Sequence, residues 1–158
     1  MTIQQGTSTP APSQDHIGYW VGSLASAIGK GLGEELAPMG VTPTQWAILE
    51  AAFAGNANTL TGLARIIPVD AAAISRHLDK LGDKGLIRRR RLRSDRRTVR
   101  IELTEAGRDL VLKLAPRVQA NFARFFSGVT PDEQAQFIEV IRRMLENGCS
   151  ATGPESDP

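Results

Sequence analysis

The sequence predicts a mainly α-helical protein that carries one small two-stranded β hairpin. Apolar residues recur at spacings of three and four over most of the 158 residues, which is the period of amphipathic helices. Only one segment, 98–103, alternates polar and apolar residues with period two, and arginine-rich sequence precedes it. Glycines and prolines divide the helical pattern into separate segments.

The composition limits the class of protein. A hydrophobic fraction of 41% in 158 residues excludes collagen-like and disordered chains and suits one domain or a compact two-part subunit. No run of 18 apolar residues is present, so we expect neither a membrane-spanning helix nor a membrane partner. The N-terminus lacks the regions of a secretory signal, and the single cysteine, Cys149, cannot form an internal disulfide. We therefore expect a cytoplasmic protein of bacterial type.

The N-terminal part is predicted to be a disordered polar arm followed by a glycine-rich helix. The arm covers residues 1–13, and an apolar helical face follows over Asp15–Leu36. Each of the five glycines in this helix costs about 0.5–1 kcal/mol relative to alanine. Packing against another helix must therefore stabilise it, and Pro38 and Gly40 are expected to end it.

The next helix has a complete start signal. Thr42 is expected to be its N-cap, Pro43 suits the first helical position, and Gln45 completes a capping box. Gly55 and Asn56 are expected to end it.

Two helices with a short turn between them come next. The first is expected over Leu60–Ile67 and ends at Pro68. Asp70 is expected to cap the second helix, which runs to about Lys84 and stops at Gly85.

The last third of the chain is predicted to hold the hairpin and two more helices. The hairpin covers Leu86–Leu103, with its turn near Asp95. Thr104 is expected to cap a long helix that reaches about Ser127. A second capping box at 130–133 begins the last helix, which we expect to stop at Asn147 and Gly148, before a disordered tail at 149–158.

The formal net charge of +2 conceals a strong asymmetry. Residues 84–100 contain nine lysines and arginines but one acid, Asp95, whereas the rest of the chain contains 10 cations and 16 acids. We expect these arginines mainly to repel one another unless a polyanion binds them. The asymmetry favours a nucleic-acid partner over a solvated run of charge.

The order of these elements predicts a winged helix-turn-helix with helical regions on either side. The DNA-binding domain would be 42–103, and the flanking helical regions would be 14–41 and 104–148. In this fold the second helix of the pair enters the major groove of duplex DNA, where alanine contacts thymine methyl groups and arginine binds guanine. From this helix we expect DNA contacts by Ala71, Ala72, Ser75, Arg76 and Lys80, and by His77 unless it lies at the edge of the module; Asp79 shares the exposed face.

The stretch LTGLARIIPVDAAAISRHLDKLGDKGLIRRRRLRSDRRTVRIELTEAG, residues 60–107, resembles the DNA-binding module of the MarR family of transcription regulators. Its most specific part is DKLGDKGLI followed by SDRRTVRIELTEAG, and the flanking helices extend the resemblance over most of 15–147. The resemblance implies a nucleoid-associated homodimer that binds a palindromic operator in double-stranded DNA. It implies that 14–41 with 104–148 form a helical dimerisation region. It also implies frequent control by a small aromatic molecule or by oxidation, and favours repression over activation.

The resemblance also assigns roles in the wing, with two departures from the family pattern. Ile67, Pro68 and Val69 stand where the family usually has a glycine-containing turn, and arginines replace the usual wing prolines. By resemblance, Arg96 or Arg97 enters the minor groove, and Asp95 fixes the tip by pairing with an arginine. The wing residues expected to contact DNA are Arg91, Arg93, Asp95, Arg96 and Arg97.

Four of the eight aromatic residues lie in two short segments, as Tyr19, Trp20, Trp46 and Phe53. They fit either a packed junction or an aromatic-lined pocket. Because the resemblance implies effector sites between the dimerisation helices and the DNA-binding lobe, we expect a pocket for a small aromatic acid or phenol. His16 or Arg65 would orient the polar end of that molecule, and no cofactor is expected.

Other classes of function have less support. The sequence contains no G-x-S-x-G, no H-E-x-x-H and no phosphate-binding glycine loop, so we do not expect an enzyme. The two histidines and the distant Cys149 do not form a metal-binding pattern, so no metal is expected. Three alternatives stay open: a winged helix that binds protein, one that binds RNA, and an oxidant-responsive regulator that uses Cys149.

Overall fold

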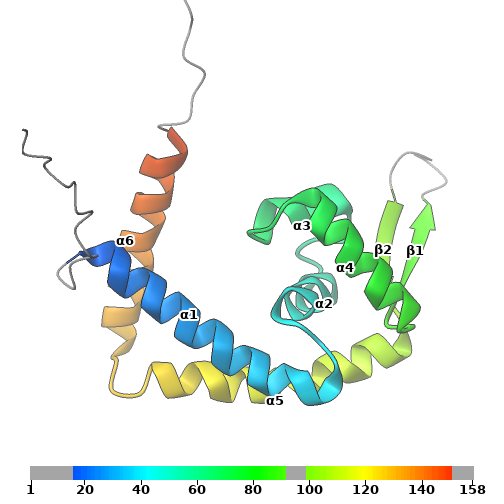
Figure 1. The fold of residues 1–158 in the computed structure, drawn as a ribbon, viewed down its shortest axis with the longest axis horizontal. Helices are drawn as coiled ribbons and strands as arrows, with labels where there is room; N and C mark the ends of the chain where they lie inside the picture. The colour runs from blue at the N-terminus through cyan, green and yellow to red at the C-terminus, as the bar shows by residue number, and fades with distance from the viewer. Residues whose placement is uncertain (1–15, 92–98, 151–158) are drawn as a thin grey trace, which may run out of the picture. The chain divides into compact units, whose positions relative to one another are not determined.

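The computed structural model describes residues 16–91 and 99–150, which form helices and one two-stranded antiparallel sheet (Figure 1). The elements in chain order are α1 (Ile17–Leu36), the 3-10 turn η1 (Ala37–Met39), α2 (Pro43–Ala54), α3 (Leu60–Ile66), α4 (Ala71–Asp83), β1 (Ile87–Arg91), β2 (Val99–Leu103), α5 (Glu105–Phe125) and α6 (Pro131–Ser150). This order confirms the predicted mainly α fold with a two-stranded β wing. The predicted arm at 1–13, the wing tip at 92–98 and the tail from 151 lie outside the described residues.

The chain divides into two compact units, the first ending at Phe122 and the second beginning at Ala123. The first unit has one hydrophobic core, and α3, α4 and the two strands gather around α2 (Figure 1). Its fully buried aliphatic side chains are Leu36, Ile48, Leu49, Leu63, Ile74, Leu81 and Leu114. The core therefore joins the end of α1 and the first half of α5 to the helix pair and the hairpin. The predicted functional division, with a dimerisation region at 14–41 and 104–148 and a DNA-binding domain at 42–103, stays a prediction.

The predicted helix starts at Thr42 and Asp70 are confirmed, whereas α1 begins at Ile17, after the predicted Asp15. The Thr42 hydroxyl accepts the Gln45 N–H at 3.3 Å, and the Gln45 amide oxygen accepts the Thr42 N–H at 3.2 Å. The Asp70 carboxylate accepts the Ala73 N–H at 2.7 Å and so caps α4. Gly85, with a φ of 68°, takes the left-handed conformation just after α4. These caps satisfy backbone groups that have no partner inside the helices.

The second unit begins α6 with the other predicted capping box. The Thr130 hydroxyl accepts the Glu133 N–H at 3.3 Å, and the Glu133 carboxylate accepts the Thr130 N–H at 2.8 Å. This backbone hydrogen bond, helped by one from the Thr130 hydroxyl, holds the pKa of the Glu133 carboxyl below its usual value. No helix among the described residues is long and apolar enough to cross a bilayer.

The predicted end of the last helix is wrong. The helix α6 continues through Asn147 and Gly148 and includes Cys149 and Ser150. Gly148 does not adopt a positive φ, so it is not a left-handed stop, and a glycine inside a helix costs only about 1 kcal/mol. The backbone of Cys149 therefore belongs to a helix and not to a tail, while its side chain lies outside the described part.

A close backbone contact joins the base of the hairpin to α5. The Leu86 carbonyl accepts the Thr104 N–H at 3.1 Å, and the Thr104 hydroxyl donates to the Gly85 carbonyl at 2.7 Å. The same hydroxyl accepts the Gly107 N–H at 3.1 Å, which confirms Thr104 as the cap of α5. A Cβ atom on Gly107 would lie 2.1 Å from the Leu86 carbonyl oxygen, so this position accepts only glycine without movement of the backbone.

The hairpin is also attached to the segment before α3. The Ile101 N–H donates to the Asn58 carbonyl at 2.7 Å, and Thr59 forms an isolated antiparallel bridge with Arg100. On the inner face of the hairpin Ile87 lies opposite Leu103, and Arg89 lies opposite Ile101. The hairpin therefore packs on the helix pair through one face only.

We predict that Gly107→Ala lowers the free energy of unfolding by about 2–3 kcal/mol, because the added methyl group overlaps the Leu86 carbonyl. Gly82→Ala is the matched control, since nothing lies within 4 Å of a Cβ atom there. That variant should be neutral or more stable by up to about 1 kcal/mol. Urea titration followed by circular dichroism measures both, and equal stabilities would contradict the close contact.

We also predict that Asp70→Ala destabilises the protein by about 1 kcal/mol, because α4 loses its N-terminal acceptor. Asp70→Asn keeps a side-chain oxygen at the same place and should retain most of the stability. Thermal unfolding of the three proteins separates the two effects. A loss of the same size in both variants would mean that the negative charge near the helix dipole, and not the hydrogen bond, is what matters.

Candidate nucleic-acid interface

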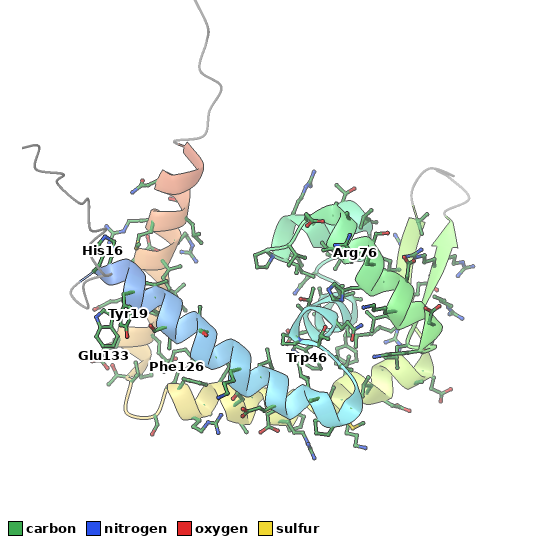
Figure 2. All side chains as sticks on the ribbon, viewed as in Figure 1. His16, Tyr19, Trp46, Arg76, Phe126 and Glu133 are labelled. Atoms are coloured by element: carbon green, nitrogen blue, oxygen red, sulfur yellow. The ribbon has the colours of Figure 1, made fainter. Side chains whose placement is uncertain are left out.

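The helix α4 presents one polar face outward and packs the other into the core. Ile74, Leu78 and Leu81 are buried on the packed side. Among the residues predicted to contact DNA, those exposed on α4 are Ala71, Ala72, Arg76 and Lys80 (Figure 2 shows Arg76), and Asp79 is exposed with them. Ser75 is half-buried. An exposed face with this composition suits contacts to the edges and phosphates of a duplex.

His77 follows the exposed Arg76 on α4 and precedes the buried Leu78. It is half-buried, and its Nδ1 atom is enclosed by protein without a hydrogen-bond partner among the described residues. The sequence predicts either the DNA-facing side or the edge of the module for this side chain, and its partial burial is compatible with both. Its contact with DNA stays a prediction.

The connection before α4 is short and partly buried. Ile67 packs in the core, and its carbonyl accepts the Val69 N–H at 2.8 Å across Pro68. Asp70 then caps α4. Pro68 thus lies in a tight turn, where its fixed φ reduces the number of conformations that the turn can adopt.

The described arginine side chains of β1, those of Arg88, Arg89 and Arg90, are paired with acids, contrary to the expectation that they mainly repel one another. Glu102 accepts from Arg88 Nε at 3.1 Å and lies 3.7 Å from Arg90 Nη1. Arg89 Nη2 lies 2.7 Å from Asp79 Oδ1. The acids were missed because they lie outside residues 84–100, although counting the hairpin register places Glu102 directly opposite Arg88. The strand therefore carries less uncompensated charge than its composition indicates.

Other cations of the module are not neutralised in this way. Arg76, Lys80 and Arg100 make no ion pair with any residue in 16–91 or 99–150. The Lys84 ammonium donates to the Gly40 carbonyl, in the connection between α1 and α2. The exposed face of α4 therefore keeps two cations available for an anionic partner.

The wing tip falls outside the described residues. Arg93, Asp95, Arg96 and Arg97 lie there, and the side chain of Arg91 is not described either. Arg91 lies opposite Val99 in the register, which defines where the two strands enter the tip. The minor-groove contacts of the wing stay predictions.

The six residues predicted to form an effector pocket lie at the start of α1, on α2 and on α3. The Nδ1 atom of His16 accepts the Gly18 N–H at 3.2 Å at the start of α1, and the rings of Tyr19 and Trp20 meet edge to face at 5.4 Å. Trp46 lies on α2 and is 3% exposed, whereas Trp20 is 60% exposed. Figure 2 shows His16 and Tyr19 at the amino-terminal end of α1, away from Trp46. Phe53 on α2 and Arg65 on α3 are exposed.

No group of three or more His, Cys, Asp or Glu side chains in the described residues is arranged to hold a metal ion.

Comparison with known proteins identifies this arrangement. The profile of the MarR family matches residues 41–99, which run from the start of α2 to the start of β2. Two solved structures are similar over nearly their whole length. CouR from Rhodococcus jostii RHA1, bound to p-coumaroyl-CoA, is 26% identical with a TM-score of 0.73, covering 90% of this chain and 100% of CouR. Wild-type MarR from E. coli, in its apo form, is 25% identical with a TM-score of 0.67, covering 82% of this chain and 97% of that protein.

A third structure shares the fold at lower identity. BpsR from Bordetella bronchiseptica, whose DNA binding is regulated by 6-hydroxynicotinic acid, is 20% identical with a TM-score of 0.75. The similarity covers 85% of this chain and 96% of BpsR. The profile match identifies residues 41–99 as a winged-helix module of the MarR family of transcription regulators, and these structures share the fold over most of the chain.

Proposed function

We propose that this chain is a ligand-responsive repressor that binds a palindromic operator in duplex DNA as a homodimer. The observation that carries the proposal is the exposed face of α4, where Arg76 and Lys80 make no ion pair with any described residue and two alanines leave room for thymine methyl groups. The wing residues Arg91, Arg93, Asp95, Arg96 and Arg97 would add contacts to the adjacent minor groove. This function would place the protein on the nucleoid, in the cytoplasm.

Exposed apolar side chains support self-association. Ile17, Trp20, Val21 and Leu24 are exposed on α1. On α6 the exposed side chains include Phe137, Ile138, Met144 and Leu145. Apolar side chains gathered on one element usually mark a surface that a partner covers. A symmetric dimer would place two α4 helices about 34 Å apart, or roughly 10 base pairs between half-site centres.

The first test is selection of bound duplexes from a random pool, followed by titration of the selected site at several salt concentrations. If the dimer neutralises about eight phosphates, a plot of the logarithm of the binding constant against the logarithm of the salt concentration should have a slope of about −7. Arg76→Ala should weaken binding to the selected site by about 1–3 kcal/mol, because the arginine contacts a base or phosphate there. Arg117→Ala on α5 removes the same charge at another exposed position and should leave the affinity unchanged.

Three outcomes would contradict the proposal. A pool that yields no preferred duplex would remove sequence-specific recognition. Equal displacement by an RNA competitor would favour an RNA-binding winged helix. A monomer by light scattering that still binds the full palindrome tightly would remove the dimer.

The second test concerns the effector. We propose that it is a small aromatic acid or phenol that binds near the start of α1. The residues proposed to contact it are His16, Tyr19 and Trp20, with Trp46, Phe53 and Arg65 on the side of the DNA-binding module. The ligands of CouR and BpsR support this class, since both contain an aromatic ring. Because Trp20 is exposed and Trp46 is buried, a ligand at α1 should shift mainly the Trp20 emission. Trp46→Phe leaves Trp20 as the reporter, and Trp20→Phe is its counterpart.

We expect p-coumaric acid, 6-hydroxynicotinic acid or a related phenol to shift the emission of the single-tryptophan protein and to weaken DNA binding. Reciprocal coupling of about 1–3 kcal/mol corresponds to a roughly 5–150-fold loss of DNA affinity. A compound that binds without changing DNA affinity would contradict the coupling. A response to peroxide, abolished by Cys149→Ser, would instead identify an oxidant-responsive regulator.

A further inference from the structure

Arg89 is the arginine of β1 that faces α4. In the hairpin register it lies opposite Ile101, on the same face as Ile87, whereas Arg88 and Arg90 lie on the other face with Glu102. Arg89 Nη2 contacts Asp79 Oδ1 at 2.7 Å and the Ser75 carbonyl oxygen at 3.5 Å. Ser75 and Asp79 are one helical turn apart, so one guanidinium from the wing spans a turn of α4.

Close packing does not hold this guanidinium in place. Arg89 borders a cavity of about 160 Å³, together with Leu78 and Ile101 at the junction between α4 and the hairpin. The side chains of Arg89 and Asp79 are 44% and 56% exposed. Exposed ion pairs contribute little to folding stability. The pair therefore adds little to the stability of the fold, but it is a polar contact between the wing and α4 beside the apolar packing of Ile87 and Ile101.

Asp79 also occupies an unfavourable place for an acid. It is exposed on α4 next to Lys80 and three residues from Arg76, on the face proposed to approach DNA. A carboxylate there repels phosphates, so by itself it lowers affinity for every duplex. Its contact with Arg89 is what offsets this repulsion.

We propose that Asp79 is a positioning residue for DNA recognition, which acts by holding Arg89 across α4 so that the wing and the recognition helix meet the duplex as one unit. This inference rests on the proposed function and adds the origin of its selectivity. Without the contact, α4 and the wing bind DNA with less mutual constraint. The preference for the correct sequence then falls, while general affinity for DNA rises.

The test compares Asp79→Asn with the unchanged protein on two duplexes of equal length and composition, the selected site and its scrambled form. The substitution removes the charge but keeps the shape. We expect scrambled DNA to bind roughly three- to tenfold more tightly, because repulsion is lost and Arg89 is freed for a phosphate. The selected site should gain nothing, so the specificity ratio should fall by about three- to tenfold.

Two further variants show whether Asp79 acts through Arg89. Asp83→Asn removes the same charge one turn later on α4, where no ion pair with a described residue is present, and should tighten both duplexes equally. In an Arg89→Gln background, Asp79→Asn should no longer change the specificity ratio, because its partner is absent. Asp79→Glu should restore the ratio. Amide exchange of β1 and β2 in the free protein should be faster in Asp79→Asn than in Asp83→Asn.

The outcomes separate this inference from the proposed function. If the unchanged protein prefers no duplex sequence, both the proposed function and this inference are wrong. If the unchanged protein is selective and Asp79→Asn keeps the full ratio, or lowers only the melting temperature, the inference alone is wrong. If Asp79→Asn changes the preferred base at one position even in the Arg89→Gln background, Asp79 contacts a base directly, which also overturns the positioning role.

Discussion

One backbone carbonyl, that of Leu86, determines how the hairpin leaves α4 and joins α5. It accepts the Thr104 N–H and occupies the space that a side chain at position 107 would need. Because β1 begins at the next residue and β2 ends just before Thr104, this contact defines the base of both strands. The helix α4 ends at Asp83, only a few residues earlier, so the end of α4, the base of the wing and the start of α5 meet at this carbonyl.

The electrostatics of the module depend on which acids the fold brings to the arginines. In sequence, residues 84–100 are almost purely cationic. In space, Glu102 lies beside Arg88 and Arg90, and Asp79 lies beside Arg89. Among the described residues, an approaching polyanion therefore meets Arg76 and Lys80 of α4 and Arg100 of β2 without an ion pair, whereas Arg88, Arg89 and Arg90 are partly compensated. Charge counts along a sequence overestimate such a surface when the acids come from neighbouring elements.

The sequence predicted those parts of the structure that depend on a few adjacent residues. The capping boxes at Thr42 and Thr130, the cap at Asp70 and the left-handed stop at Gly85 all form within one turn, so their residue types identify them. The end of α6 was misplaced because glycine inside a helix is only weakly unfavourable. The pair of Arg89 and Asp79 depends on how β1 docks on α4, which no local pattern specifies. The proposed effector residues lie on three helices, and their spacing in sequence does not define how those helices meet.

The position of Glu102 has a consequence for how such a regulator diverges. One half-buried carboxylate, 26% exposed, lies against two guanidinium groups on the outer face of the hairpin. A single substitution at this site releases two cations without altering any residue proposed to contact DNA. Related proteins can therefore differ at Glu102, and so in the general affinity of the wing for nucleic acid, while the residues proposed to recognise the DNA sequence stay the same. A substitution at Glu102 would thus change general affinity for DNA alone, whereas one at Asp79 would change affinity and selectivity together.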